Sequence, residues 1–521
     1  MTTKSRYDSI VVGGGHNGLV CAAILARSGR SVLVLEAAPQ LGGAAVTREF
    51  APGFKVSSCA HLLHLMPAWL MRELDLKGQG LKLAAERLPT TALAPDGAHL
   101  TLTGDASALR QRSVADAAAY ADWQALLGRL ARSLAPLLGA TPPRLGSGAW
   151  RERAALLRLG WQVRRLGRHD LRELLRIGGM CVQDLLDERF ESSLLKGALA
   201  LDAVLGTNFG PRSPGTVFSL LYREAAAGGG AATLAQPAGG LGALSAALGR
   251  AASAAGADIR TATPVERIVV RADRACGVVL ASGEEIAAKS VISNADPKTT
   301  YLGLLGSEHL DAGFVRRVAT LRTRGLAAKL HLALDRMPEF QSLERAALRG
   351  RLLVAPSPEY IERAFNHAKY GEFSAGPILE VTVPTIADPS LAPPGQHVLS
   401  AIVQYAPYSL EGGWEPQRQR FTELVIDTIS SFAPDLRRSV LSAELLTPPD
   451  IEREFRIAGG HWHHAELALD QFFMVRPVAG AAQYQAPVAG LYLCGAGCHP
   501  GGGVMGIAGR NAAREVLREA A

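Results

Sequence analysis

The pattern of apolar and polar positions at the start of the chain predicts a strand, a helix and a second strand. Residues 10–12 form a short apolar β-type run that stops at a group of glycines. Residues 19–26 then carry apolar side chains at helical spacing, and residues 31–35 form a second β-type run that ends at Glu36. A strand, a glycine-rich turn, a helix, a strand and an acid in this order are typical of a unit that binds an adenine dinucleotide.

The glycines of this turn have the Gly-x-Gly-x-x-Gly spacing, and each has its own physical task. Gly13 allows the tight turn, Gly15 lets the backbone approach a pyrophosphate, and Gly18 lets helix and strand pack closely. The phosphates would lie at the positive N-terminal end of the helix, and Glu36 would accept hydrogen bonds from a ribose diol. The predicted cofactor-binding residues of this unit are Gly13, Gly15, His16, Asn17, Gly18, Glu36 and Ala37.

The rest of the chain divides into a helical part and a strand-rich part. Residues 105–210 are rich in Ala, Leu and Arg and predict helices. Alternation of apolar and polar residues predicts strands at 329–335, in part of 378–383 and at 397–405. The alternation places His331 on the polar face of its strand, where it would contact solvent or line a cavity.

Two further stretches carry glycines or histidines at informative positions. His61 and His64 are predicted to share one face of a short helix that continues through Leu74, as an ordinary packed or surface pair. Near the other end, a strand at 490–493 leads into glycines and then into a helix predicted from Val504 to about Arg518.

These glycine-rich blocks together carry a resemblance to a known family. The chain is similar to the FAD-dependent carotenoid (phytoene) desaturases and carotenoid ketolases, within the amine-oxidase-like flavoproteins. The motifs that carry the resemblance are residues 13–18, Glu36, 42–45, 236–242, 293–297 and the glycines between 495 and 506. The resemblance implies FAD as the cofactor and adds Gly42, Gly43, Ala44, Val265, Gly495, Gly503, Val504 and Met505 to the predicted cofactor site.

The resemblance also implies an α/β fold, in which a Rossmann-type FAD-binding domain is interleaved with an α+β substrate domain. The expected FAD-binding domain comprises residues 1–75, 235–300 and 450–521. The expected substrate domain comprises 76–234 and 301–449, with the helical and membrane-associating region at 105–210. Val504 and Met505 are expected to open a helix whose positive end faces the pyrimidine edge of the flavin.

Composition and charge limit the cellular locations and the binding partners that we expect. A chain of 521 residues with 48% hydrophobic and 20% charged residues is globular and long enough for two domains. No apolar run reaches the roughly 18–20 residues of a membrane span, no leader is recognisable, and the six cysteines have no disulfide or ligand spacing. We therefore expect a cytoplasmic protein, with the inner face of a membrane as a further location.

The net charge of +7 is concentrated in one helical stretch. Residues 144–176 hold nine arginines against three acids, which leaves +6. A basic amphipathic helix at 150–161 can lie in an anionic membrane interface, or it can cover a core while its arginines are solvated. Nucleic acid is not an expected partner because no reading motif or aromatic platform accompanies the charge.

A polar segment near the C-terminus supplies the candidate catalytic residues. Residues 459–467 contain three histidines and a glutamate, of which His464 and Glu466 fit the His-x-Glu pattern of the resembling family. Contact with cofactor or substrate, general-base catalysis and metal binding are the candidate roles, in that order, and no metal is expected. Ala44 stands where desaturases commonly have an arginine, so phytoene itself is not the expected substrate.

Three classes of function remain compatible with these residues. The first is an FAD-dependent oxidoreductase that dehydrogenates or oxidises a lipophilic, polyene- or isoprenoid-like substrate by hydride transfer to flavin, with O2 or a quinone as electron acceptor. The second is an FAD-dependent amine oxidase on the same fold. The third is a non-catalytic lipid-binding escort protein, which the intact glycine motif disfavours. The sequence leaves the oligomeric state open.

Overall fold

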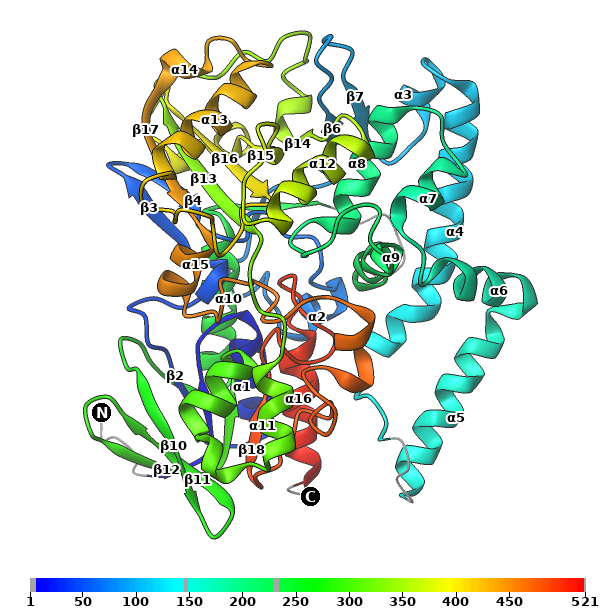
Figure 1. Ribbon diagram of the computed structural model, residues 1–521. Helices are drawn as coiled ribbons and strands as arrows, with labels where there is room; N and C mark the ends of the chain where they lie inside the picture. The colour runs from blue at the N-terminus through cyan, green and yellow to red at the C-terminus, as the bar shows by residue number, and fades with distance from the viewer. Residues whose placement is uncertain (1–5, 145–148, 228–233, 520–521) are drawn as a thin grey trace.

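A mixed sheet with a parallel centre forms one half of the molecule (Figure 1). The computed structural model describes residues 6–144, 149–227 and 234–519. The strands of this first sheet are β1 (Arg6–Val12), β2 (Val32–Leu35), β9 (Asp258–Arg260), β10 (Val265–Arg271), β11 (Arg274–Leu280), β12 (Glu285–Ser293) and β18 (Leu491–Leu493). The parallel layer has the order β18-β12-β1-β2-β9, and β12 also pairs with the antiparallel hairpin of β11 and β10. The expected α/β fold is confirmed.

Three helices pack together against this sheet. They are α1 (His16–Arg27), α10 (Leu241–Ala254) and α16 (Ile507–Glu519). Both α10 and α16 contact α1. A Cβ at Gly509 would lie 2.0 Å from the Asn17 carbonyl oxygen, so the approach of α16 to α1 requires a glycine there.

The terminal helix begins later than the sequence pattern predicts. Val504 has a φ of 57° and Gly506 a φ of 74°, both in the left-handed region that an α-helix cannot include. The helix therefore starts at Ile507, and the prediction that Val504 and Met505 open it is wrong. These residues instead form an irregular approach to the helix.

The second sheet forms the other half of the molecule and is antiparallel except at one pair. Its strands are β6 (Thr90–Ala92), β7 (Leu100–Leu102), β13 (Ala327–Leu334), β14 (Arg351–Val354), β15 (Ile378–Thr382), β16 (His397–Gln404) and β17 (Val440–Leu446). Their order is β17-β13-β16-β15-β14-β6-β7, with β14 and β6 parallel. The three predicted strands around residues 330, 380 and 400 are the centre of this sheet.

Strand β13 is buried on both faces, which contradicts the alternation read from the sequence. All eight of its residues are buried, and His331 is fully buried. One face is covered by the ribbon of β3 (Thr47–Ala51) and β4 (Phe54–Ser57), and the Phe50 ring lies 5.6 Å from the His331 ring. His331 also contacts the Ser58 carbonyl at 3.1 Å, so it is a packed core histidine rather than a solvent-facing one.

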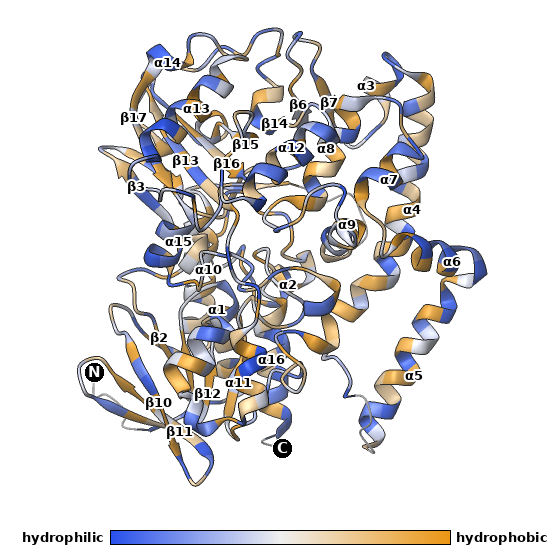
Figure 2. Ribbon diagram, in the orientation of Figure 1, coloured by the Kyte–Doolittle hydropathy of each residue, from blue (hydrophilic) through white to orange (hydrophobic). Residues whose placement is uncertain are grey.

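Helices cover the outer side of the second half. They are α3 (Ser107–Arg110), α4 (Val114–Leu138), α6 (Gly167–Ile177), α7 (Val182–Asp187), α8 (Ser193–Val204), α9 (Thr216–Ala226), α12 (Pro358–Lys369) and α13 (Arg418–Ser430). Between α4 and α6, helix α5 (Trp150–Arg165) extends beside the first half instead (Figure 1). Helix α5 lies apart from the main body, mixes hydrophilic and hydrophobic positions and has no buried residue (Figures 1 and 2). Among the described helices, none is long and apolar enough to cross a membrane.

The remaining labelled helices and strands are short, and one of them lies in a different domain from the one expected. They are α2 (Ala68–Glu73), β5 (Leu83–Ala85), β8 (Gln236–Pro237), α11 (Ala312–Ala319), α14 (Leu436–Ser439) and α15 (Pro448–Phe455). Tyr301 and Phe314 pack in the core of the first sheet with their rings 4.9 Å apart. The segment around α11 thus belongs with the first core, and the expected domain boundary at residue 300 lies too early.

Only the second half of the helix that was predicted through His61 and His64 is helical in the structure. Helix α2 starts at Ala68, and Pro67 occupies its N-cap position. Residues before Pro67 are biased away from helical backbone, which explains the late start. His61 and His64 consequently lie in an irregular segment.

Candidate functional site

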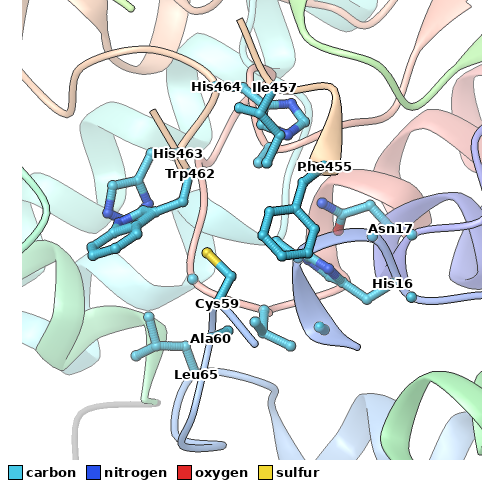
Figure 3. A pocket seen from close by; sticks show the side chains of 18 of the residues that line it. His16, Asn17, Cys59, Ala60, Leu65, Phe455, Ile457, Trp462, His463 and His464 are labelled. Atoms are coloured by element: carbon cyan, nitrogen blue, oxygen red, sulfur yellow. The ribbon is translucent and has the colours of Figure 1, made fainter. Parts of the chain in front are cut away.

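A cavity lies between the two sheets and is lined by segments from both halves of the chain (Figure 3). It encloses about 1900 Å³, including space that is open to solvent. Its lining joins the glycine turn after β1 to Arg351, Glu380 and Ile402 of the second sheet, so one cavity extends from the nucleotide turn to the second half of the chain.

At one end of the cavity, the turn after β1 presents the start of a helix. Gly15 is the N-cap residue of α1 and supplies no side-chain cap, so the first amides of α1 have no side-chain acceptor. A Cβ at Gly15 would lie 2.7 Å from Asn294 Nδ2, which leaves little room for any other residue. The backbone is thus open to a close anionic group, as a pyrophosphate requires.

Glu36 is held in a fixed orientation beside this turn. Its Oε2 accepts a hydrogen bond from the Gly14 N–H at 2.7 Å, and its Oε1 accepts one from the Ala38 N–H at 2.8 Å. Each carboxylate oxygen keeps a second acceptor site. Since Glu36 lines the cavity, those acceptors are available to the two hydroxyls of a ribose.

Buried polar atoms beside the same helix end have no partner within the described residues. They are His16 Nε2 and Asn17 Oδ1, and both side chains line the cavity (Figure 3). Burial lowers the pKa of His16 to about 4, so its imidazole is neutral at neutral pH. Unpaired buried polar atoms are rare in folded proteins, and a bound dinucleotide would satisfy these. The residues present fit FAD.

Most of the sequence-predicted cofactor residues meet at this cavity. Those that line it are Gly13, Gly15, His16, Asn17, Glu36, Ala37, Gly42, Gly43, Ala44, Val265, Gly503 and Val504. Gly18, Gly495 and Met505 are not among the lining residues. A Cβ at Gly18 would lie 2.2 Å from the Gly13 carbonyl oxygen, and Met505 is buried. These residues therefore pack behind the residues that line the cavity.

The histidine segment supplies a further group of side chains to the same cavity. Trp462, His463 and His464 line the cavity (Figure 3). Burial lowers the pKa of His464 to about 4, and its Nδ1 has no hydrogen-bond partner within the described chain. A neutral imidazole with a free nitrogen can accept a proton. His464 therefore stays a candidate general base, and the catalytic role remains a prediction.

Glu466 has a different environment from His464. It is not among the lining residues and is 1% exposed. Its Oε2 accepts a hydrogen bond from the Asn208 N–H at 2.9 Å, and its Oε1 accepts one from the Leu467 N–H at 3.1 Å. The geometry does not favour direct catalysis by Glu466; the carboxylate positions the segment instead.

A buried arginine holds this segment in place. Arg476 is fully buried, and its guanidinium donates to backbone carbonyls of the segment and of the glycine loop before α16. The acceptors are the carbonyl oxygens of His463, Ala465, Glu466, Gln471 and Ala496, at 2.8 to 3.3 Å. One side chain therefore ties the histidine segment to the residues that lead into α16.

The substrate-domain wall of the cavity contains a charged cluster that the sequence did not reveal. Arg351 makes two 2.6 Å contacts to Asp202 and one 2.9 Å contact to Glu380. Glu380 also contacts His61 Nε2 at 2.8 Å, and His61 Nδ1 lies 2.6 Å from Lys329 Nζ. Burial lowers the pKa of Lys329 to about 7. Lys329, which with His331 interrupts an otherwise apolar strand, was the available signal for this cluster.

His61 and His64 both line the cavity, and neither is a surface residue. Burial lowers the pKa of His61 to about 4 and that of His64 to about 3. Within the ranges that the structure describes, no group of three histidine, cysteine or acidic residues is arranged to hold a metal ion. The site is accordingly organised by backbone amides, neutral imidazoles and ion pairs.

The fold and this cavity define a class of protein with a Rossmann-type nucleotide site beside an internal chamber. The model of the flavin-containing amine oxidoreductase family matches residues 18–517. The chain belongs to this family, and it is an FAD-dependent oxidoreductase by that membership.

Individual relatives extend over the whole chain. A mouse (Mus musculus) protein, pyridine nucleotide-disulfide oxidoreductase domain-containing protein 2, is 39% identical over 99% of this chain and 94% of its own. A limonene dehydrogenase polypeptide of Castellaniella defragrans is 28% identical over 100% of this chain and 96% of its own. A putrescine oxidase variant has the same fold, with a TM-score of 0.65 and 15% identity over 99% of both chains. The family and the cofactor expected from the glycine motifs are confirmed.

Proposed function

We propose that this protein dehydrogenates a lipophilic small molecule in the chamber between its two sheets. The single observation that carries the proposal is the continuity of one cavity, from the uncapped start of α1 and Glu36 to an inner wall lined by His464, Trp462 and apolar side chains. The similarity to a limonene dehydrogenase polypeptide supports an apolar substrate.

The chain's own residues supply binding, orientation and a proton acceptor. The amides of the first turn of α1, the Glu36 carboxylate and the polar groups of His16 and Asn17 would hold the pyrophosphate and ribose of FAD. Bound FAD supplies the hydride-accepting chemistry. His464 Nδ1 would take up the proton lost from the carbon next to the oxidised one.

The surrounding residues keep this proton transfer away from water. Trp462, Phe455 and Ile457 line the cavity near His464 (Figure 3). Arg476 fixes the backbone on both sides of His464 through the carbonyls of His463 and Ala465. A base with a fixed position in an apolar environment needs little reorganisation when it reacts.

The direct test is to purify the protein, record its absorption spectrum and mix it with candidate substrates without oxygen. We expect a bound flavin spectrum that bleaches with a lipophilic polyene or partly saturated isoprenoid, tested with and without a polar end group, and that recovers with O2 or a quinone, without NADPH. Bleaching by amines alone would favour the amine oxidase alternative. A full flavin spectrum that no candidate from either class bleaches would contradict the proposed dehydrogenation and favour an escort role.

A further inference from the structure

The face of α9 that lines the cavity carries hydrogen-bond donors. Ser219, Tyr222 and Arg223 lie at positions i, i+3 and i+4 of the helix, so they share one face, and all three line the cavity. Tyr222 donates its hydroxyl to the Gly502 carbonyl at 2.8 Å. The Ser219 Oγ is buried and has no partner in the described part of the chain, although the residue is only 3% exposed. This hydroxyl needs a partner from within the cavity.

Arg223 is the second donor with unused capacity. Among the described residues, one carboxylate lies within ion-pair distance of its guanidinium: Asp202, at 3.6 Å, which is beyond hydrogen-bond range. Five N–H donors in a rigid fork suit two oxygens of one ligand group better than this single long contact. Arg223 also contributes to the lowered pKa of both His64 and His463, so the guanidinium lies among neutral imidazoles.

The carboxylates on the cavity wall are already paired. Both oxygens of Asp202 accept from Arg351 at 2.6 Å, and Glu380 accepts from Arg351 and His61. The third lining carboxylate, Glu36, accepts from backbone amides at the nucleotide end. Glu224 on α9, whose pKa is raised to about 7, does not line the cavity. A ligand cation would therefore find no free carboxylate, whereas a ligand oxygen anion would find free donors.

We propose that α9 binds an oxygen anion of the substrate, and that the substrate is a lipophilic carboxylate rather than a hydrocarbon or an amine. The inference rests on the proposed function and deepens it, because it assigns a substrate class to the same cavity. A carboxylate can accept both N–H groups of the Arg223 fork and the Ser219 hydroxyl. Its apolar chain would then lie along the Ala203, Leu205 and Leu234 side chains of the wall.

Calorimetric titration of the purified holoprotein with three probes of equal length tests the proposal: decanoic acid, 1-decanol and decylamine at neutral pH. We expect decanoate to bind about tenfold or more tightly than 1-decanol, since charge-assisted hydrogen bonds exceed neutral ones. Decylamine should bind more weakly than both. Equal binding of decanoate and 1-decanol, or tighter binding of decylamine, would overturn the inference.

Variants then assign the binding to α9. Arg223→Met should weaken decanoate binding by about 10- to 100-fold and leave 1-decanol binding unchanged. Ser219→Ala should weaken decanoate binding by a smaller factor. Because this substitution removes a hydroxyl that has no partner in the described part of the protein, the variant should fold as the parent does. The exposed Arg363 on α12 provides the matched control, and Arg363→Met should bind all three probes as the parent protein does. Unchanged decanoate binding in Arg223→Met would refute the assignment.

Flavin content separates this inference from the proposed function. The flavin absorbance of Arg223→Met should equal that of the parent, because Arg223 is assigned to substrate and not to cofactor. A parent protein that purifies without flavin would contradict the proposed function, and the calorimeter would still register decanoate binding and its dependence on Arg223.

Discussion

A neutral imidazole can accept a proton, and burial alone is enough to keep His464 neutral at physiological pH. Its φ of 61° lies in the left-handed region, which is uncommon for a residue with a Cβ. The backbone hydrogen bond from His464 N–H to the His461 carbonyl at 2.7 Å and the Arg476 contacts on both sides hold it there. At this scale the proposed mechanism depends on His464 as the proton acceptor and on Arg476, which fixes the backbone on both sides of it.

The role of His464 can be separated from that of Glu466 by matched variants. His464→Ala should retain FAD and slow anaerobic flavin reduction by about 100-fold or more, because a general base typically contributes that much. Glu466→Gln keeps an acceptor oxygen for the Asn208 amide and should slow reduction only slightly. Stopped-flow absorbance measures both rates. Equal rates in parent and His464→Ala would remove His464 from the mechanism.

A second prediction concerns Gly15 and Glu36 at the nucleotide end of the cavity. Glu36→Lys replaces an acceptor of ribose hydroxyls by a cation, and Gly15→Val introduces atoms where Asn294 already leaves little space. Both variants should purify with little flavin, as read from the absorbance ratio of flavin to protein. Gly160→Ala on α5, where a Cβ meets nothing within 4 Å, is the control and should keep its flavin. Full flavin content in both test variants would refute the assignment of this end.

At the scale of elements, α5 and α6 stand out because several of their large apolar side chains are exposed. Trp150, Leu157 and Trp161 of α5 are 74%, 69% and 60% exposed, and Leu175 of α6 is 75% exposed. Hydrophilic positions alternate with hydrophobic ones along both helices (Figure 2), and many of the hydrophilic residues are arginines. Aromatic and apolar residues beside arginines suit the interface of an anionic bilayer. We propose that this pair of helices brings the protein to a membrane surface that supplies its substrate.

Charge reversal tests that proposal directly. Arg164, Arg165 and Arg168 are exposed, and their triple replacement by Glu should abolish co-sedimentation with phosphatidylserine-containing vesicles. The parent should bind at low salt and dissociate as the ionic strength rises, since surface charges are screened. Triple replacement of the exposed arginines at 316, 345 and 363 is the control and should leave binding intact. If the parent protein does not bind anionic vesicles at low salt, the arginines form a solvated surface and the membrane proposal is wrong.

At the scale of the whole molecule, buried histidines couple folding to pH. The pKa is lowered to about 4 for His16, His61, His464 and His499, and to about 3 for His64. Below their ordinary pKa of 6.5, the unfolded chain binds protons that the folded chain does not, so stability falls as the pH falls. Glu224, whose pKa is raised to about 7, opposes this trend with a single group.

We therefore expect the free energy of unfolding to decrease steadily as the pH falls from about 6.5 to 4. Urea denaturation followed by circular dichroism at a series of pH values measures this decrease. His499→Gln removes one of the titrating groups, away from the predicted base, and should reduce the slope. A midpoint that stays constant over this interval would contradict the buried, neutral state of these histidines.

The sequence predicted those parts of the molecule that depend on local spacing. The turn at residues 13–18 and Glu36 lie within one βαβ unit, so their relation could be read from the order of residues alone. The cluster of Asp202, Arg351 and Glu380 could not be predicted, because β14, β15 and α8 bring together residues from three distant segments. The same applies to His331, whose strand alternates in sequence but is covered by a ribbon from elsewhere in the chain.

The pairing of β1 with β12 has a consequence for how the protein is made. Arg6 lies opposite Ala287, so β1 leaves the ribosome long before the strand that completes its sheet has been synthesised. At about 5–20 residues per second, the wait is on the order of 15 to 55 s. During that time one edge of β1 has no neighbour, and β18 arrives later still. Gly503 and Val504 line the same cavity as the glycine turn, so the complete cavity forms only long after that turn has been synthesised.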